Sequence, residues 1–205
     1  MAGLTGFDPA DIAPFLARLV RLSPDAVVRL RPAGPRTALW GRVPWGVLVT
    51  RTVPGPELAD RTVGAAALLR SVTEGDGSLP PARDHDWRWA LPPEPARTVE
   101  ELPASEIRRV GTAAAQTLRE ARGRVGERVL RDALLDHVPI VVTAGAERIE
   151  IRQSLVQAML RMAFMSTNES ARVTVRIAGT WAGLAAEFGS TWLQNAAGLT
   201  IRLAK

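Results

Sequence analysis

The sequence contains no cysteine and no tyrosine, and its only histidines are His85 and His137. The absence of cysteine excludes disulfides, thiol catalysis and cysteine-ligated zinc or iron–sulfur centres. Proton transfer would have to rely on carboxylates, hydroxyl groups, arginine or the two histidines, which is a thin repertoire for an enzyme. We therefore expect no cofactor and no metal, and a protein that binds rather than catalyses.

Lysine is almost absent as well. Lys205 is the only lysine, so arginine supplies the rest of the 26 basic residues, and the formal net charge is +5. A charge of this size suits an ordinary soluble domain, and alone it is weak support for a nucleic-acid partner. The sequence also has no long apolar run and no signal-like N-terminus, so we expect a cytoplasmic protein without a membrane partner.

The apolar periodicity predicts an α+β fold of two related halves, each with amphipathic helices packed on a short-stranded antiparallel sheet. A first helix is expected to start with Asp11 as its N-cap, and a second to cover residues 57–70. Six prolines fall between residues 79 and 103, which excludes long regular structure there. We predict an N-terminal half over residues 1–78, a proline-rich connector over 79–104 and a C-terminal half over 105–205.

A weak internal repeat supports the two halves. Residues 23–34 (SPDAVVRLRPAG) align without gaps to residues 168–179 (NESARVTVRIAG), with Arg31 matching Arg176 and Gly34 matching Gly179. Each copy follows an amphipathic helix and precedes strands that carry tryptophan and glycine. Two amphipathic strands can also resemble each other by chance, so the sequence leaves duplication as a hypothesis.

Arginines alternate with aliphatic residues in both copies of the repeat. Arg29 and Arg31 share one face of the first predicted strand, and Arg172 and Arg176 share one face of the second. Together these arginines could bind an acidic ligand or the acidic surface of a protein. The leading hypothesis is a non-enzymatic binding or protein-interaction module; its oligomeric state stays open, and a homodimer is compatible with it.

A glycine turn offers a second hypothesis. The segment Arg122, Gly123, Arg124, Val125, Gly126, Glu127, Arg128 lies between two predicted helices, and a hairpin and a third helix follow. Over residues 105–165 this resembles the KH module, in which a GxxG turn clamps a nucleic-acid backbone. The resemblance implies that Arg122, Gly123, Arg124, Gly126 and Arg128 would contact phosphates. The long alanine-rich first helix and the lack of an obvious preceding strand depart from that family, and a simple glycine break between helices explains the same pattern.

The segment Asp84-His85-Asp86 offers a third hypothesis, an enzyme in which a carboxylate orients the histidine. On an extended segment neighbouring side chains point to opposite faces, so both aspartates would not flank His85 on one side. A solvated loop anchored by Trp87 and Trp89 is the simpler interpretation.

The arginine-for-lysine usage, the tryptophan- and glycine-bearing strands and the proline-rich middle together resemble the conserved signature proteins of actinobacteria. That resemblance implies a protein of unknown function and transfers no site residues.

Overall fold

The structure of the chain is a computed structural model, and it describes all residues except 1–3, 5, 57, 122–125, 146 and 196–205. In chain order the elements are α1 (Pro9–Leu22), β1 (Val27–Ala33), β2 (Arg36–Arg42), β3 (Leu48–Pro54), β4 (Arg61–Gly64), α2 (Ala65–Glu74), the 3-10 helix η1 (Asp84–Asp86), β5 (Arg97–Pro103), α3 (Ala104–Glu120), α4 (Glu127–Asp136), β6 (Ile140–Ala144), β7 (Glu147–Ile151), α5 (Gln153–Arg161), β8 (Arg172–Ala178), β9 (Trp181–Ala186) and β10 (Gly189–Gln194). Within the described residues, no helix combines the length and apolarity that crossing a membrane requires.

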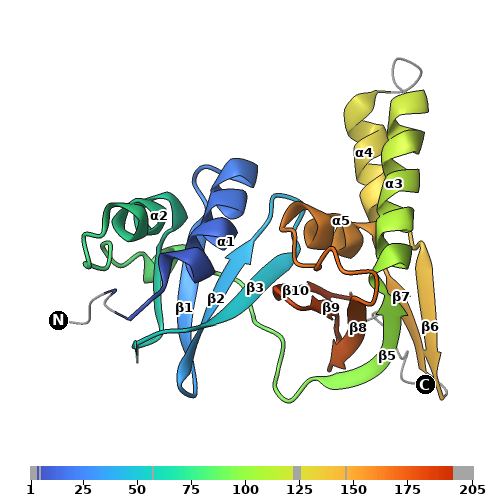
Figure 1. The fold of residues 1–205 in the computed structure, drawn as a ribbon. Helices are drawn as coiled ribbons and strands as arrows, with labels where there is room; N and C mark the ends of the chain where they lie inside the picture. Colours follow the sequence, from blue (N-terminus) through green and yellow to red (C-terminus); the bar gives the residue numbers. More distant parts are fainter. Residues whose placement is uncertain (1–3, 5, 57, 122–125, 146, 196–205) are drawn as a thin grey trace, which may run out of the picture.

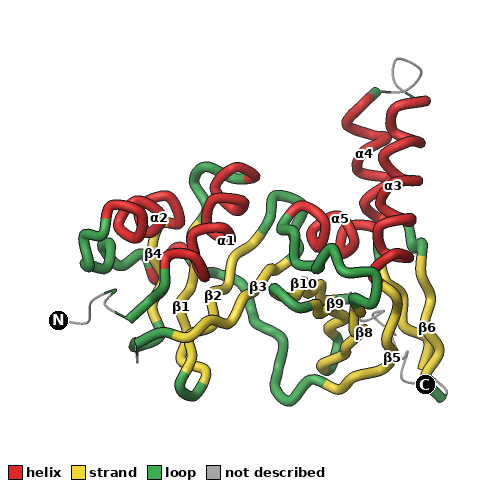
Figure 2. Tube along the Cα trace, viewed as in Figure 1, coloured by secondary structure: helices red, strands yellow, loops and turns green. Residues whose placement is uncertain are grey.

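One eight-stranded antiparallel sheet runs through the molecule in the order β4-β1-β2-β3-β10-β9-β8-β5, and β6 and β7 form a separate hairpin. The helices lie together on one side of this sheet (Figures 1 and 2). The segment between α2 and β5 crosses the opposite side, which carries no α-helix (Figure 1). We call that side the helix-free face.

The sheet consists of two equivalent sets of four strands that meet where β3 pairs with β10. The first half comprises α1, β1, β2, β3, β4 and α2. The second half comprises β5, α3, α4, β6, β7, α5, β8, β9 and β10. We call the β3–β10 contact the seam.

The two halves match residue by residue around the sequence repeat. Arg31 pairs with Ala38 between β1 and β2, and Arg176 pairs with Gly183 between β8 and β9 in the same register. Gly34 and Gly179 both end their strands with positive φ, 61° and 56°, a conformation that favours glycine. The α+β fold of two related halves predicted from the sequence is therefore confirmed.

The order of elements differs between the halves. In the first half β4 and α2 come last along the chain, whereas their counterparts β5 and α3 come first in the second half. The second half also contains α4 and the β6–β7 hairpin, which have no counterpart in the first. Helices α3 and α4 stand out from the sheet as an arm (Figure 1).

The main core lies between the helices and the helix-covered face of the sheet. Alternate strand residues such as Leu30 and Leu39 point into it, as do Val173 and Leu184 in the second half, and all are fully buried. Burying each such side chain contributes roughly 1.5–3 kcal/mol. The stacked rings of Phe15 and Phe164, with centroids 6.2 Å apart, connect the cores of the two halves.

Two sequence predictions about helices are wrong. Helix α1 is capped by Asp8, whose carboxylate accepts a hydrogen bond from the Ala10 amide at 2.8 Å, and not by Asp11. Pro9 fits the first turn, while Pro14 lies inside the helix, where burial of the neighbouring apolar residues offsets its cost. Residues 61–64 form β4 rather than helix, because Val63 and its neighbours pair with β1.

The connector predicted over residues 79–104 includes η1 and the whole of β5. Strand β5 pairs with β8 and so extends the sheet of the second half. Trp87 and Trp89 lie in irregular structure. The boundaries after residues 78 and 104 stay a prediction.

Candidate functional site

The pleat of the sheet places all four predicted arginines on the helix-free face, alternating with the core residues. Apolar side chains share this face with them in a second, smaller cluster: Ala38, Trp40, Leu48, Ala178, Trp181 and Trp192. Trp87, Trp89, Leu91 and Ala96 of the connector pack against this cluster. The helix-free face is thus a tryptophan-rich layer flanked by guanidinium groups.

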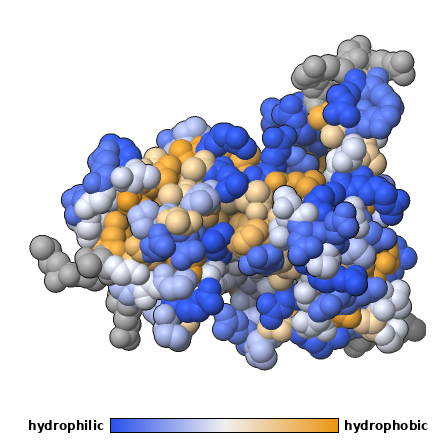
Figure 3. All heavy atoms as spheres, in the orientation of Figure 1, coloured by the Kyte–Doolittle hydropathy of each residue, from blue (hydrophilic) through white to orange (hydrophobic). Residues whose placement is uncertain are grey.

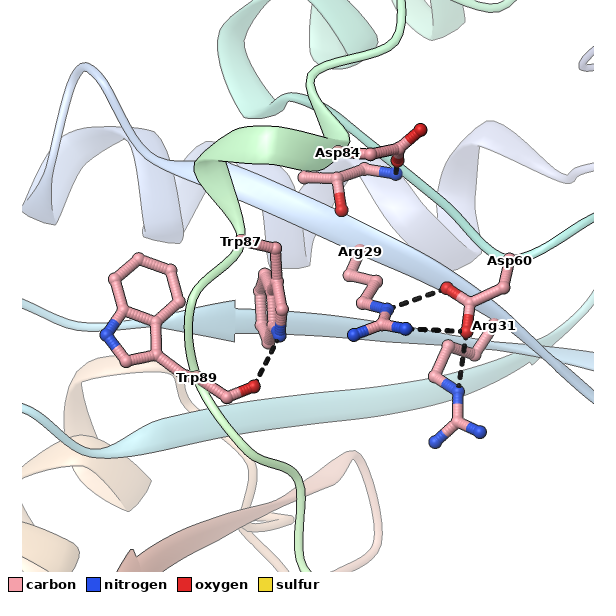
Figure 4. Close-up of polar contacts among 7 residues, drawn as sticks. Arg29, Arg31, Asp60, Asp84, Trp87 and Trp89 are labelled. Carbon is pink, nitrogen blue, oxygen red and sulfur yellow. Dashed lines mark hydrogen bonds and ion pairs between the residues drawn. The ribbon is translucent and has the colours of Figure 1, made fainter.

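Arg29 and Arg31 are already paired within the chain. Arg29 Nε donates to Asp60 Oδ1 at 2.6 Å and its Nη2 donates to Oδ2 at 2.9 Å, while Arg31 Nε donates to the same Oδ2 at 3.1 Å (Figure 4). The hydrogen bond to the Asp60 carboxylate raises the pKa of Arg29 above its ordinary value. The bidentate pair with Asp60 occupies two nitrogens of Arg29, so few of its donors are left for a ligand. Arg31 donates to Asp60 only through Nε.

Arg176, the counterpart of Arg31, meets no carboxylate in the described part of the chain. Its Nη2 donates to the carbonyl of Ala96 at 3.2 Å, and its guanidinium lies 6.0 Å from the ring centroid of Trp192. Its Nε is buried and has no hydrogen-bond partner among the described residues. Arg172 is exposed at the start of β8. Of the four predicted arginines, Arg176 is therefore the one that keeps a buried donor without a partner among the described residues.

A cavity of about 700 Å³ brings Arg31 and Arg176 together over the seam. Thr50 and Ser190, which pair across β3 and β10, line it together with Trp40 and Trp192. Thr50 is only 8% exposed and its Oγ1 has no hydrogen-bond partner among the described residues. We call this the seam cavity; its lining is Arg31, Pro32, Ala33, Ala38, Trp40, Thr50, Thr52, Pro92, Pro93, Glu94, Pro95, Ala96, Arg176, Ser190 and Trp192.

The lining of the seam cavity can do two things chemically. The indoles of Trp40 and Trp192 offer apolar surface, and the two guanidinium groups with the Thr50 hydroxyl offer donors to an anion. Glu94, on the connector that borders the cavity, opposes anions there. Such a lining fits a carboxylate held beside an apolar group.

The predicted nucleic-acid turn is only partly described. Arg122, Gly123 and Arg124 lie outside the described residues, whereas Gly126 and Arg128 are exposed at the start of α4. A strand, β5, does precede α3, contrary to the sequence expectation. It pairs with β8, however, while β6 and β7 form their own sheet, so these elements do not share one sheet around the glycine turn.

The Asp84-His85-Asp86 segment is a 3-10 helix, so the expectation of an extended segment is wrong. Asp84 accepts a hydrogen bond from the Thr62 amide at 2.5 Å, and Asp86 accepts one from Arg83 Nε at 2.6 Å. His85 lies 3.1 Å from Asp86 with its side chain 79% exposed. In the described ranges, no group of three or more histidines and carboxylates is placed to hold a metal ion.

Three residues of the site were not found from the sequence: Asp60, Thr50 and Ser190. Asp60 carries no local pattern, and its role depends on the pairing of β1 with β4, which brings it beside Arg29. Thr50 and Ser190 meet only because two strands far apart in the chain pair at the seam.

The comparison with protein families identifies the chain. A family model described as a domain of unknown function, DUF8185, matches residues 91–198. The chain belongs to the DUF8185 family. A second domain of unknown function, DUF8010, matches residues 5–91 of this DUF8185 protein. No curated protein matches it.

Solved structures similar to this DUF8185 protein are bacterial sliding clamps. The β subunit of DNA polymerase III from Pseudomonas aeruginosa aligns with a TM-score of 0.57 at 12% identity, covering 92% of this chain and 63% of the subunit. The β subunit from Streptococcus pyogenes gives 0.58 at 11% identity, with 92% and 63% covered. The one from Thermotoga maritima gives 0.55 at 12% identity, with the same coverage. The chain thus spans less than two thirds of these subunits, and at such identity the likeness shows the fold alone.

Proposed function

We propose that this DUF8185 protein is a non-enzymatic protein-interaction module that receives an acidic segment of a partner protein in the seam cavity. The observation that carries the proposal is the convergence of Arg31 and Arg176 on one cavity, where Arg176 has no carboxylate partner among the described residues. A carboxylate from a partner would satisfy the guanidinium and the Thr50 hydroxyl.

The tryptophans support a peptide as the occupant. Trp40 and Trp192 are nearly buried yet still line the cavity, so an apolar neighbour of the acidic residue can cover them. Desolvated tryptophan and arginine side chains are the residues that most often dominate binding energy at protein interfaces. The clamp-like fold is consistent with such a role, since the similar structures are DNA polymerase sliding clamps, one of them named as a subunit of DNA polymerase III.

The test is the binding of a fluorescein-labelled decaglutamate peptide, followed by fluorescence anisotropy at low ionic strength. We expect Arg176→Gln to weaken binding about tenfold or more, because it removes a charge-assisted hydrogen bond from a largely buried site. The matched control is Arg70→Gln, which removes the same charge from an exposed position of α2, on the opposite side of the sheet. Equal loss in both variants would leave only nonspecific attraction and refute the proposal.

Nucleic-acid binding is the competing candidate. Gly126 and Arg128 are exposed at the start of α4, and the similar structures belong to DNA polymerase. Under this reading, RNA or duplex DNA would give a salt-dependent gel shift that Gly126→Asp abolishes. A shift that ignores Gly126→Asp, or no shift at low salt, would remove this candidate.

Composition supports an actinobacterial source and a cytoplasmic location, and a homodimer stays a hypothesis. An enzyme using Asp84, His85 and Asp86 stays a hypothesis, and retention of activity by His85→Ala in any turnover assay would count against it.

A further inference from the structure

A second cavity, of about 600 Å³, lies at the foot of the arm, on the helix side of the molecule. Helices α3 and α4 form one wall, α5 forms the base, and the end of α1 with the bend between β2 and β3 forms the other wall. Figure 3 shows hydrophobic side chains in the region between the arm and the first half. We call this the arm cavity; its lining is Leu22, Pro44, Trp45, Ala114, Ala115, Leu118, Arg131, Asp132, Leu134, Leu135, Gln153, Gln157 and Arg161.

One buried polar group faces this mostly apolar space without a partner. Gln153 is only 3% exposed, and its Nε2 has no hydrogen-bond partner in the described part of the chain. The backbone amide of Gln153 is used, since it donates to the carbonyl of His137 at 2.8 Å. The indole N–H of Trp45 also has a partner, because Nε1 donates to the carbonyl of Ser154 at 3.1 Å. The side-chain amide of Gln153 is therefore a free, desolvated donor at the cavity wall.

The packing of the arm leaves this space open. Helix α4 has no buried residue among those described, and a neighbouring cavity of about 420 Å³ shares Ala114, Leu134 and Gln153 with the arm cavity. An unsatisfied buried donor is costly, and protein interiors ordinarily close such voids. Both features are explained at once if a ligand fills the space, and pockets of this size and apolar character are typical of small-molecule sites.

We propose that the arm cavity binds an uncharged, largely apolar small molecule whose single carbonyl oxygen accepts a hydrogen bond from Gln153 Nε2. The apolar body of the ligand would lie against Trp45, Leu118 and Leu134, while Arg131, Arg161 and Asp132 keep their charges at the rim. The first half has no α4, so the fold provides one such site in each chain.

The experiment uses Nile red, an uncharged dye that carries a carbonyl and brightens in apolar surroundings. We expect saturable one-to-one binding to the full chain with blue-shifted emission. Gln153→Leu, which keeps the size of the side chain and removes the donor, should weaken binding about fivefold. Ala115→Phe, placed at an exposed position of α3 that lines the cavity, should abolish it by filling the space.

The matched control is Gln116→Leu, the same substitution at an exposed position of α3 outside the cavity lining, and it should bind as the wild type does. Thermal melts and near-ultraviolet circular dichroism establish that each variant is folded. The proposal is overturned if the dye does not saturate, or if folded Gln153→Leu and Ala115→Phe both bind it as tightly as the wild type.

Discussion

Arg31 and Arg176 occupy the same position in the two halves, but their hydrogen-bond partners differ. Arg31 shares Asp60 with Arg29 in the first half. The counterpart in the second half, Arg176, meets only the carbonyl of Ala96 and keeps a buried Nε without a partner among the described residues. The duplicated strand therefore provides one guanidinium for internal structure and one for an external anion.

The halves differ again at their outer helices. Helix α2 packs against β4 and α1 and ends at Glu74, whereas its counterpart α3 continues into the arm. The arm and the β6–β7 hairpin exist only in the second half, and the arm cavity lies at the foot of the arm. The half that carries the insertion is thus the half that offers open binding surface.

The largest expected effect tests whether equivalent core residues contribute equally to stability in the two halves. Leu68 of α2 and Ile107 of α3 are equivalent and fully buried. Replacing either by alanine should lower the free energy of unfolding by about 2–5 kcal/mol, because each leaves a core cavity. Urea denaturation measures this, with the exposed Arg70→Ala and Gln116→Ala as controls for α2 and α3. A loss below about 1 kcal/mol at one position would break the energetic equivalence of the halves.

The next effect concerns a position where the halves differ by one methyl group. Ala38 in β2 corresponds to Gly183 in β9, and a Cβ at Gly183 would lie 2.5 Å from Cε3 of Trp192. Gly183→Ala should therefore cost about 1–3 kcal/mol through overpacking, and displace Trp192 in near-ultraviolet circular dichroism. The reciprocal Ala38→Gly should cost only about 0.5–1 kcal/mol. The reverse ranking would contradict the close contact between Trp192 and Gly183.

A smaller effect is expected when Arg31 loses its carboxylate partner and so becomes more like Arg176. Asp60→Asn removes the carboxylate that holds Arg29 and Arg31, and these partly exposed pairs contribute about 0.5–1 kcal/mol to stability. Because Arg31 would then be free, decaglutamate should bind about two- to fivefold more tightly. Asp25→Asn removes the same charge at another exposed position and should leave the affinity unchanged. Weaker binding in Asp60→Asn would show that Asp60 orders the site rather than competes for it.

The smallest effect concerns the arm. Val129 on α4 is 67% exposed, so Val129→Ser should change the free energy of unfolding by less than about 0.5 kcal/mol. Hydrogen exchange should be faster in α4 than in α2, because α4 buries no described residue. Slow exchange in α4 together with a large loss in Val129→Ser would indicate that another surface covers the arm in solution.

The sequence predicted what local periodicity determines. Alternation of arginine with valine and leucine in residues 27–33 and 172–178 places one face in the core, so the strands and the two-halved fold could be foreseen. Strand β4 could not, since Arg61–Gly64 is too short for a pattern and is held by pairing with β1. The cap at Asp8 was missed because the tolerance of Pro14 depends on core packing.

The site was foreseeable only in part, for the same reason. The repeat already relates Arg31 to Arg176, and both line the seam cavity. Asp60, Thr50 and Ser190 become significant through strand pairings between distant segments, which no local pattern encodes. The sequence therefore indicates which arginines form the site, and the pairing of the strands determines which arginine keeps an unsatisfied donor.

The most direct test of this account is the affinity of labelled decaglutamate for three proteins: the wild type, Arg31→Gln and Arg176→Gln. We expect a loss of about tenfold or more in Arg176→Gln and a clearly smaller loss in Arg31→Gln, because Arg31 already donates to Asp60, whereas Arg176 meets no carboxylate among the described residues. Equal affinities in the two variants, or a larger loss in Arg31→Gln, would contradict the division of roles between the halves.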